Sequence, residues 1–128
     1  MFRFERLRVW HKAVELYDVI DDVAQQLRSR PHFFLADQLR RAALSVASNI
    51  AEGTGRETNR DAQHFFTVAK GSAFEALSIS TICHRRGLIS PDRFQEIYGR
   101  VEDISKMLSG LKRRSGEAKA ESLDGAMV

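Results

Sequence analysis

The segment SPDRFQEIYGRVEDISKMLSGL, residues 90–111, decides the fold class of this chain. Its first two residues, Ser90 and Pro91, are a typical helix start, because serine caps free backbone amides and proline fits the first helical position. Apolar residues then recur at alternating spacings of three and four: Phe94, Ile97, Val101, Ile104, Leu108 and Leu111. This pattern predicts a helix that buries one stripe against neighbouring helices.

Three stretches upstream also repeat apolar residues at helical spacing, and they predict helices over residues 7–28, 33–52 and 58–86. In the first of these, the predicted buried face consists of Trp10, Ala13, Val14, Tyr17, Ile20, Ala24 and Leu27. Thr58 is the predicted N-cap of the third helix. We expect Gly53 and Gly55 to end the second helix and Gly87 to end the third, because glycine takes the left-handed C-terminal conformation without strain.

The connections between these four helices are short, which favours antiparallel neighbours. We therefore predict an all-α, up-down-up-down four-helix bundle over residues 1–114, followed by a loose tail over residues 115–128 where the periodicity is lost. The single cysteine, Cys83, excludes an internal disulfide and fits a reducing compartment. No apolar run is long enough to span a bilayer, so we expect a cytoplasmic protein with no membrane partner.

The bundle topology turns a modest net charge of +3 into two basic ends around an acidic middle. One end, at the first and third connections, collects the candidate nucleic-acid-binding residues Arg28, Arg30, Arg40, Arg41, Arg85, Arg86 and Arg93. The opposite end collects Arg3, Arg6, Arg8, Arg56, Arg60, Lys112, Arg113 and Arg114. Because arginine matches phosphate groups bidentately, these ends fit RNA or DNA. The alternative is that they only keep the helix ends solvated.

Polar and small residues interrupt the apolar pattern of the second helix. The set consists of Arg41, Ser45, Ser48, Asn49, Glu52 and Gly53. Such residues permit close helix approach and hydrogen bonds between helices. The third helix offers a matching surface of small residues: Ala69, Ala73, Ala76 and Ser80, with Gly71 and Ser72. Two interpretations stay open: polar packing between the second and third helices, or an interface between subunits.

The sequence carries no recognisable catalytic apparatus. The histidines are scattered, and no spacing of histidine or cysteine makes a metal site. Glu15, Asp18 and Asp22 share a helix face, but no Glu-x-x-His motif of a di-metal bundle accompanies them. We therefore predict no catalytic residue, no metal and no cofactor.

A helix-turn-helix is a further alternative for the segment from Leu44 to Gly53 followed by residues 58–65. It is less favoured, because Thr54, Gly55 and Arg56 follow where an apolar residue usually pins the recognition helix. The next predicted helix is also too long and too apolar to lie in a DNA groove.

Four segments resemble a known family. The run QLRRAALSVASNIAEG, from Gln38 to Gly53, resembles the signature of the four-helix bundle family encoded within 23S ribosomal RNA intervening sequences. FERLRVWHKAVELY at residues 4–17, AKGSAFEAL at 69–77 and GLIS at 87–90 resemble it too, so the likeness covers nearly everything from Phe4 to Leu111. One departure is Ala47, where relatives often carry a proline.

The resemblance implies an antiparallel four-helix bundle assembled into a homopentamer. Relatives include accessory proteins of diversity-generating retroelements, which are similar to basic pentamers that bind nucleic acid and a reverse transcriptase. The resemblance places Arg40, Arg41, Asn49, Glu52 and Gly53 in the signature region. We therefore expect a non-catalytic homo-oligomer that binds RNA or DNA, with a scaffold for another protein partner as the alternative.

Overall fold

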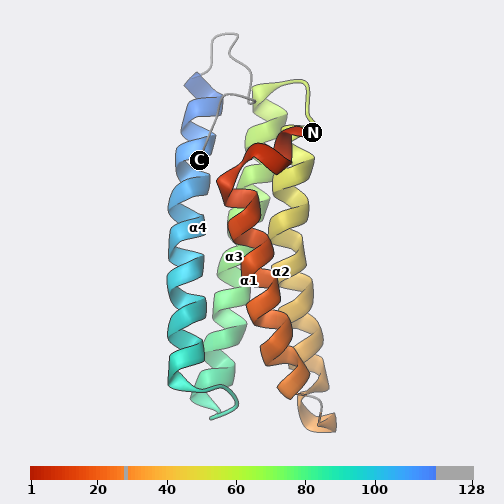
Figure 1. Cartoon of the computed structure of the whole chain (residues 1–128), viewed down its shortest axis with the longest axis vertical. Coiled ribbons are helices and arrows are strands. Elements are labelled where there is room, and N and C mark those ends of the chain that lie inside the picture. The colour runs from red at the N-terminus through yellow and green to blue at the C-terminus, as the bar shows by residue number, and fades with distance from the viewer. Residues whose placement is uncertain (28, 118–128) are drawn as a thin grey trace.

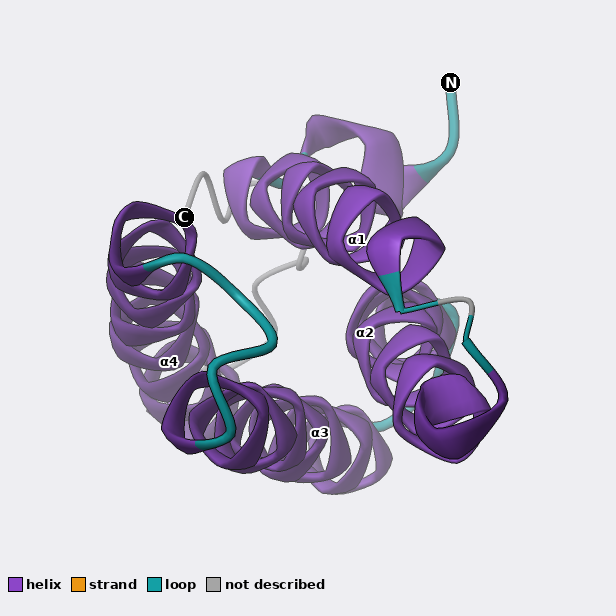
Figure 2. Cartoon of the chain, turned by 90° about the horizontal axis from the view of Figure 1, so that it is seen from below, coloured by secondary structure: helices purple, strands orange, loops and turns teal. Residues whose placement is uncertain are grey.

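The computed structural model describes residues 1–27 and 29–117, and it shows four long helices that run alternately up and down (Figure 1). They are α1 (Arg8–Gln26), α2 (Phe33–Thr54), α3 (Asn59–Arg85) and α4 (Pro91–Glu117). Two short 3-10 helices, η1 (Arg3–Arg6) and η2 (Arg30–His32), precede α1 and α2. Each helix packs on the next, and α1 also packs on α4, so the four surround a common centre (Figure 2). The predicted four-helix bundle is confirmed.

Local capping explains where α3 and α4 begin. The Thr58 hydroxyl accepts a hydrogen bond of 3.1 Å from the Asp61 amide, and the Ser90 hydroxyl accepts one of 3.1 Å from the Arg93 amide. Both hydroxyls thus satisfy amides that the first helical turn leaves without partners. Gly87 follows α3 with a φ of 71°, a conformation that favours glycine, and it ends the helix as predicted.

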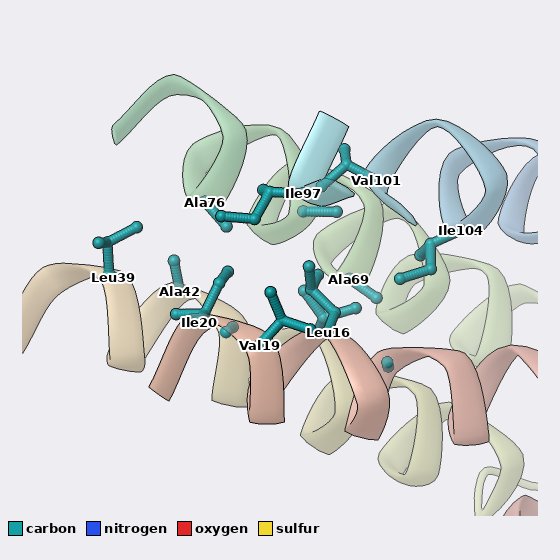
Figure 3. Close-up of a cluster of buried hydrophobic side chains, with 14 of the residues drawn as sticks. Leu16, Val19, Ile20, Leu39, Ala42, Ala69, Ala76, Ile97, Val101 and Ile104 are labelled. Carbon is teal, nitrogen blue, oxygen red and sulfur yellow. The ribbon is translucent and has the colours of Figure 1, made fainter. Parts of the chain in front are cut away.

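The core is built from all four helices (Figure 3). The predicted stripe of α4 is buried from Ile97 to Leu111, while Phe94 is partly exposed. Opposite it, Leu16 and Ile20 of α1 and Leu39 of α2 are fully buried. Alanines of α2 and α3, including Ala42, Ala43, Ala69, Ala73 and Ala76, let these two helices approach closely.

The predicted buried face of α1 is confirmed in part and corrected in part. Its buried members are Ala13, Ile20, Ala24 and Leu27. Trp10, Val14 and Tyr17 are only partly buried, while Leu16 and Val23 lie in the core. Apolar residues cover more than half of the circumference of α1, so their spacing alone does not select the face. Contacts with α2 and α4 decide it.

The prediction that Gly53 ends α2 is wrong. α2 continues through Gly53 to Thr54. Gly55 is its C-cap, as predicted, but its φ of −88° is not left-handed, and Gly87 is the only glycine of the described residues with a positive φ. Gly53 is buried where α2 meets α3, and a Cβ atom there would lie 2.6 Å from Cε1 of Phe66. Steric room for Phe66, not left-handed backbone, therefore requires glycine at this position. At the other end of the chain, α4 reaches Glu117, and residues 118–128 of the predicted tail lie outside the described residues.

Candidate nucleic-acid interface

The first and third connections lie at the same end of the bundle, as the topology predicts (Figure 1). Arg85 closes α3 and Arg86 is its C-cap. Both side chains are exposed, and with Ile82 they line a hollow of about 260 Å³. Among the described residues neither arginine forms an ion pair with a carboxylate. Arg28 lies outside the described residues, and Arg30 begins η2.

The remaining candidate arginines of this end form ion pairs within the chain. The Arg40 Nε atom lies 2.8 Å from Oδ1 of Asp21, and the Arg41 Nε atom lies 2.9 Å from Oδ2 of Asp37. Arg93 pairs with Glu96, with an Nη1–Oε1 distance of 3.1 Å. These carboxylates offset much of the positive charge that an approaching phosphate would meet.

The ion pair between Asp21 of α1 and Arg40 of α2 also affects the acidity of the Asp21 carboxyl group. The hydrogen bond from Arg40, with a second one from Gln25, holds the pKa of Asp21 below its ordinary value. Partial desolvation opposes this effect but does not outweigh it. The carboxylate of Asp21 is therefore charged at neutral pH and ties α1 to α2.

The opposite end holds a second basic region. Among its exposed basic side chains are Arg3, Arg6, Arg8, Arg56, Arg60, Arg113 and Arg114. Between η1 and the end of α2 it also contains a cleft of about 630 Å³, which we call the N-terminal cleft. Phe2, Arg3, Phe4, Ala51, Thr54, Gly55, Arg56 and Glu57 line it. The sequence pattern did not identify this cleft, although the alternation of phenylalanine and arginine over residues 2–6 is a signal for it.

The polar set of α2 divides into two groups. The Ser45 and Ser72 hydroxyl oxygens lie 2.7 Å apart, and the Asn49 amide donates to the Ser45 carbonyl at 2.8 Å and to its hydroxyl at 2.9 Å. These three residues pack between α2 and α3. Arg41, Ser48 and Glu52 instead face outward. Ser45 and Asn49 therefore fit polar packing between α2 and α3, whereas the three exposed residues fit an interface between subunits.

An apolar groove runs between α1 and α2 on the outside of the bundle. Its volume is about 370 Å³, and Phe4, Trp10, Val14, Tyr17, Leu44, Ala47, Ser48 and Ala51 line it. Leu44 is 56% exposed at its edge. The partly buried side chains of the predicted α1 face therefore form this α1–α2 groove.

The described residues offer no metal centre, since they contain no group of three or more histidine, cysteine, aspartate or glutamate side chains placed to hold an ion. Glu15, from the acidic face of α1, pairs with Arg100 at 3.1 Å.

Cys83 is buried, and burial raises the pKa of its thiol. Its neighbour His84 stacks on Phe94, with ring centroids 4.5 Å apart.

The α2–α3 pair does not form a helix-turn-helix. The two helices lie side by side and antiparallel along their length, whereas a helix-turn-helix requires a steep crossing (Figure 1). None of the described helices combines the length and the apolar character of a membrane-spanning segment.

Comparisons with known proteins agree with this architecture. A sequence model of the family described as 23S rRNA-intervening sequence protein matches residues 5–110. A solved structure of a protein of unknown function from the S23 ribosomal protein family of Bacteroides thetaiotaomicron is similar, with a TM-score of 0.77. It is 21% identical in sequence, and the match covers 82% of this chain and 98% of that one, which shows a shared fold. No curated protein matches significantly. The family match spans most of the chain, which therefore belongs to the 23S rRNA-intervening sequence protein family.

Proposed function

We propose that this protein is a non-catalytic homo-oligomer, a pentamer in accordance with its resemblance, that binds RNA or DNA through its arginine-rich ends. The observation that carries the nucleic-acid part is the pair Arg85 and Arg86. Both are exposed beside a hollow, and neither has a carboxylate partner among the described residues. Arginine presents a planar fork of donors that matches phosphate oxygens.

Assembly strengthens this weak patch. Two arginines on one subunit contact few phosphates, and salt screens such contacts effectively. A ring repeats the patch once per subunit, so that binding at one subunit raises the effective concentration at the next. The proposed oligomer is therefore part of the binding mechanism.

Fluorescence anisotropy with labelled RNA and duplex DNA, titrated at several salt concentrations, tests the nucleic-acid interface. We expect log affinity to fall linearly with log salt, with a slope of about −0.7 to −0.9 for each phosphate engaged. The variant R85E/R86E should bind at least about tenfold more weakly and with a shallower slope. Unchanged affinity in this variant would remove both arginines from the interface.

Two further variants separate contact from general charge. Lys106→Glu changes an exposed residue of α4, outside the proposed interface, and should lower affinity much less than Arg86→Glu, which alters the net charge equally. Because a glutamate at the C-terminus of α3 opposes the helix dipole, R85Q/R86Q serves as a second variant that removes charge without reversing it. Equal losses for Lys106→Glu and Arg86→Glu would indicate nonspecific attraction.

The α1–α2 groove supports the oligomeric part of the proposal. It is apolar, and Leu44 extends it at its edge with 56% of its surface exposed, so the two form one continuous apolar surface of the kind that can serve as an interface. We expect size-exclusion chromatography with light scattering to show an oligomer that Leu44→Glu dissociates. Val68→Glu, at a residue of α3 that is 39% exposed, should leave the mass unchanged. A wild-type monomer at all concentrations would contradict the proposal.

The same groove favours a second candidate function, a scaffold for another polypeptide. In that case Leu44→Glu would leave the oligomeric mass unchanged and release a stoichiometric protein partner. Absence of RNA or DNA binding at low salt would then assign the arginine-rich ends to solvation.

A further inference from the structure

The N-terminal cleft has the size and the position of a ligand site. Its volume of about 630 Å³ falls in the range usual for small-molecule clefts. It lies where η1 crosses the end of α2, and the N terminus is beside the upper end of that helix (Figure 1). This is the opposite end of the bundle from Arg85 and Arg86.

One wall of the cleft is aromatic. The rings of Phe2 and Phe4 are stacked, with centroids 6.1 Å apart and planes 10° apart. The Trp10 ring lies 4.8 Å from that of Phe4 and is tilted by 59°. Phe2 is nevertheless 73% exposed. Phe4 thus supports the Phe2 ring, which is exposed to water. An exposed, flat apolar ring of this kind accepts a planar heterocycle by stacking.

Arginines at fixed positions complete the cleft. Arg3 donates to the Thr54 carbonyl at 3.3 Å, which joins η1 to α2. Arg56 donates to Glu52 at 2.9 Å, and its guanidinium carbon lies 4.4 Å from the ring centroid of Phe65. These contacts fix the position of Arg56. Glu52 offsets part of its charge, as the carboxylates beside the paired arginines of the other end do, but a guanidinium carries five N–H groups, so Arg56 keeps donors for a phosphate oxygen.

A carboxylate in the same cleft narrows the class of ligand. Glu57 is exposed and lines the cleft beside Arg56. It opposes a bare polyanion, but its oxygens suit the amino and imino groups at the edge of a base. The ligand should therefore present a flat aromatic face, a hydrogen-bonding edge and a phosphate.

We propose that the N-terminal cleft binds an unpaired nucleotide of single-stranded nucleic acid, with its base stacked on Phe2 and its phosphate held by Arg56. A duplex does not fill this site, since its bases are stacked on one another and offer no free face. The proposal goes beyond phosphate contacts at Arg85 and Arg86, because it places base recognition at the other end of the bundle.

Anisotropy with labelled oligouridine and oligoadenosine of about twelve nucleotides, against a DNA duplex of the same length, tests this site. Phe2→Ala should weaken binding of the single strands about tenfold or more and leave duplex binding unchanged. The matched control is Phe34→Ala, since Phe34 is 70% exposed at the opposite end of the bundle. It should change single-strand affinity by less than about twofold. Equal effects of the two variants, or no effect of Phe2→Ala, would overturn the assignment.

Two additional measurements identify the ligand and the end of the bundle involved. Adenosine monophosphate should compete with the strand only at concentrations far above those of the oligonucleotide. Competition at equal concentrations would make a free nucleotide the ligand and overturn the single-strand assignment. If R85Q/R86Q abolishes binding of the single strand while Phe2→Ala does not, the cleft proposal fails and the proposed function stands. If Phe2→Ala abolishes binding while R85Q/R86Q does not, the result supports the cleft and removes Arg85 and Arg86 from the interface.

Discussion

At the scale of residues, Gly53 shows how one missing side chain fixes the distance between two helices. A methyl group there would overlap Phe66, which is fully buried. Gly53→Ala should therefore destabilise the protein by about 1–3 kcal/mol, despite the better helix propensity of alanine. Gly71→Ala is the matched control, because nothing lies within 4 Å of a Cβ at this exposed helical position. It should stabilise by about 0.5–1 kcal/mol. Urea unfolding measures both, and shifts in the same direction would contradict this account.

The Asp21–Arg40 pair makes a second residue-scale prediction, about acid stability. Because the folded state lowers the pKa of Asp21 from 3.8, the pair stabilises the fold fully above that value and loses its effect as the pH falls through the lowered pKa. Wild-type protein should lose its stability advantage over Asp21→Asn as acidity increases below about pH 4. Thermal unfolding between neutral and acidic pH measures this difference. Asp18→Asn removes an exposed carboxyl of the same helix and leaves the Asp21–Arg40 pair intact, so it serves as the matched control for the change of charge.

At the scale of elements, the α2–α3 contact combines small residues with one buried polar cluster. Ser72 is 8% exposed and shares its hydroxyl contact with Ser45. Ser45→Ala should destabilise by about 1–2 kcal/mol, because the Ser72 hydroxyl loses its partner. The double variant S45A/S72A should cost less than the sum of the single variants, because it removes both polar groups. A double-mutant cycle in urea measures the coupling, and strict additivity would show that the two hydroxyls act independently.

Helix limits and faces were predictable from the sequence to different degrees. The starts of α3 and α4 follow from Thr58 and from Ser90–Pro91, because local hydrogen bonds determine them. The core face of α1 was predictable only in part. Some of its predicted residues are buried, but Trp10 and Leu16 both fit helical spacing, and only the packing of α2 and α4 separates them. Gly53 was misassigned because local rules for helix ends do not include Phe66, thirteen positions later in the chain.

At the scale of the whole molecule, the position of the two basic ends was predictable from the topology. Which of their arginines form ion pairs was not. Connection order placed Arg40, Arg41 and Arg93 near Arg85 and Arg86, whereas ion pairs form between side chains whose positions the sequence does not give. The N-terminal cleft was missed for a related reason: the exposure of Phe2 depends on how η1 folds over α2.

One shared core also predicts one unfolding transition. All four helices contribute to the same buried cluster, and Trp10, the single tryptophan, reports on α1 and η1. Unfolding followed by Trp10 fluorescence should coincide with unfolding followed by far-ultraviolet circular dichroism, which reports on every helix. An earlier fluorescence transition would show that η1 and the N-terminal part of α1 open independently of the bundle.

The contact between Gly53 and Phe66 also limits which substitutions can become fixed at these two positions. Any lineage that gains a side chain at position 53 must shorten the one at position 66, or separate two helices that small residues otherwise hold together. The two positions should therefore vary together across the family, with bulk exchanged between them and their combined volume nearly constant. Such paired replacements would show that the spacing between α2 and α3 is retained within the family.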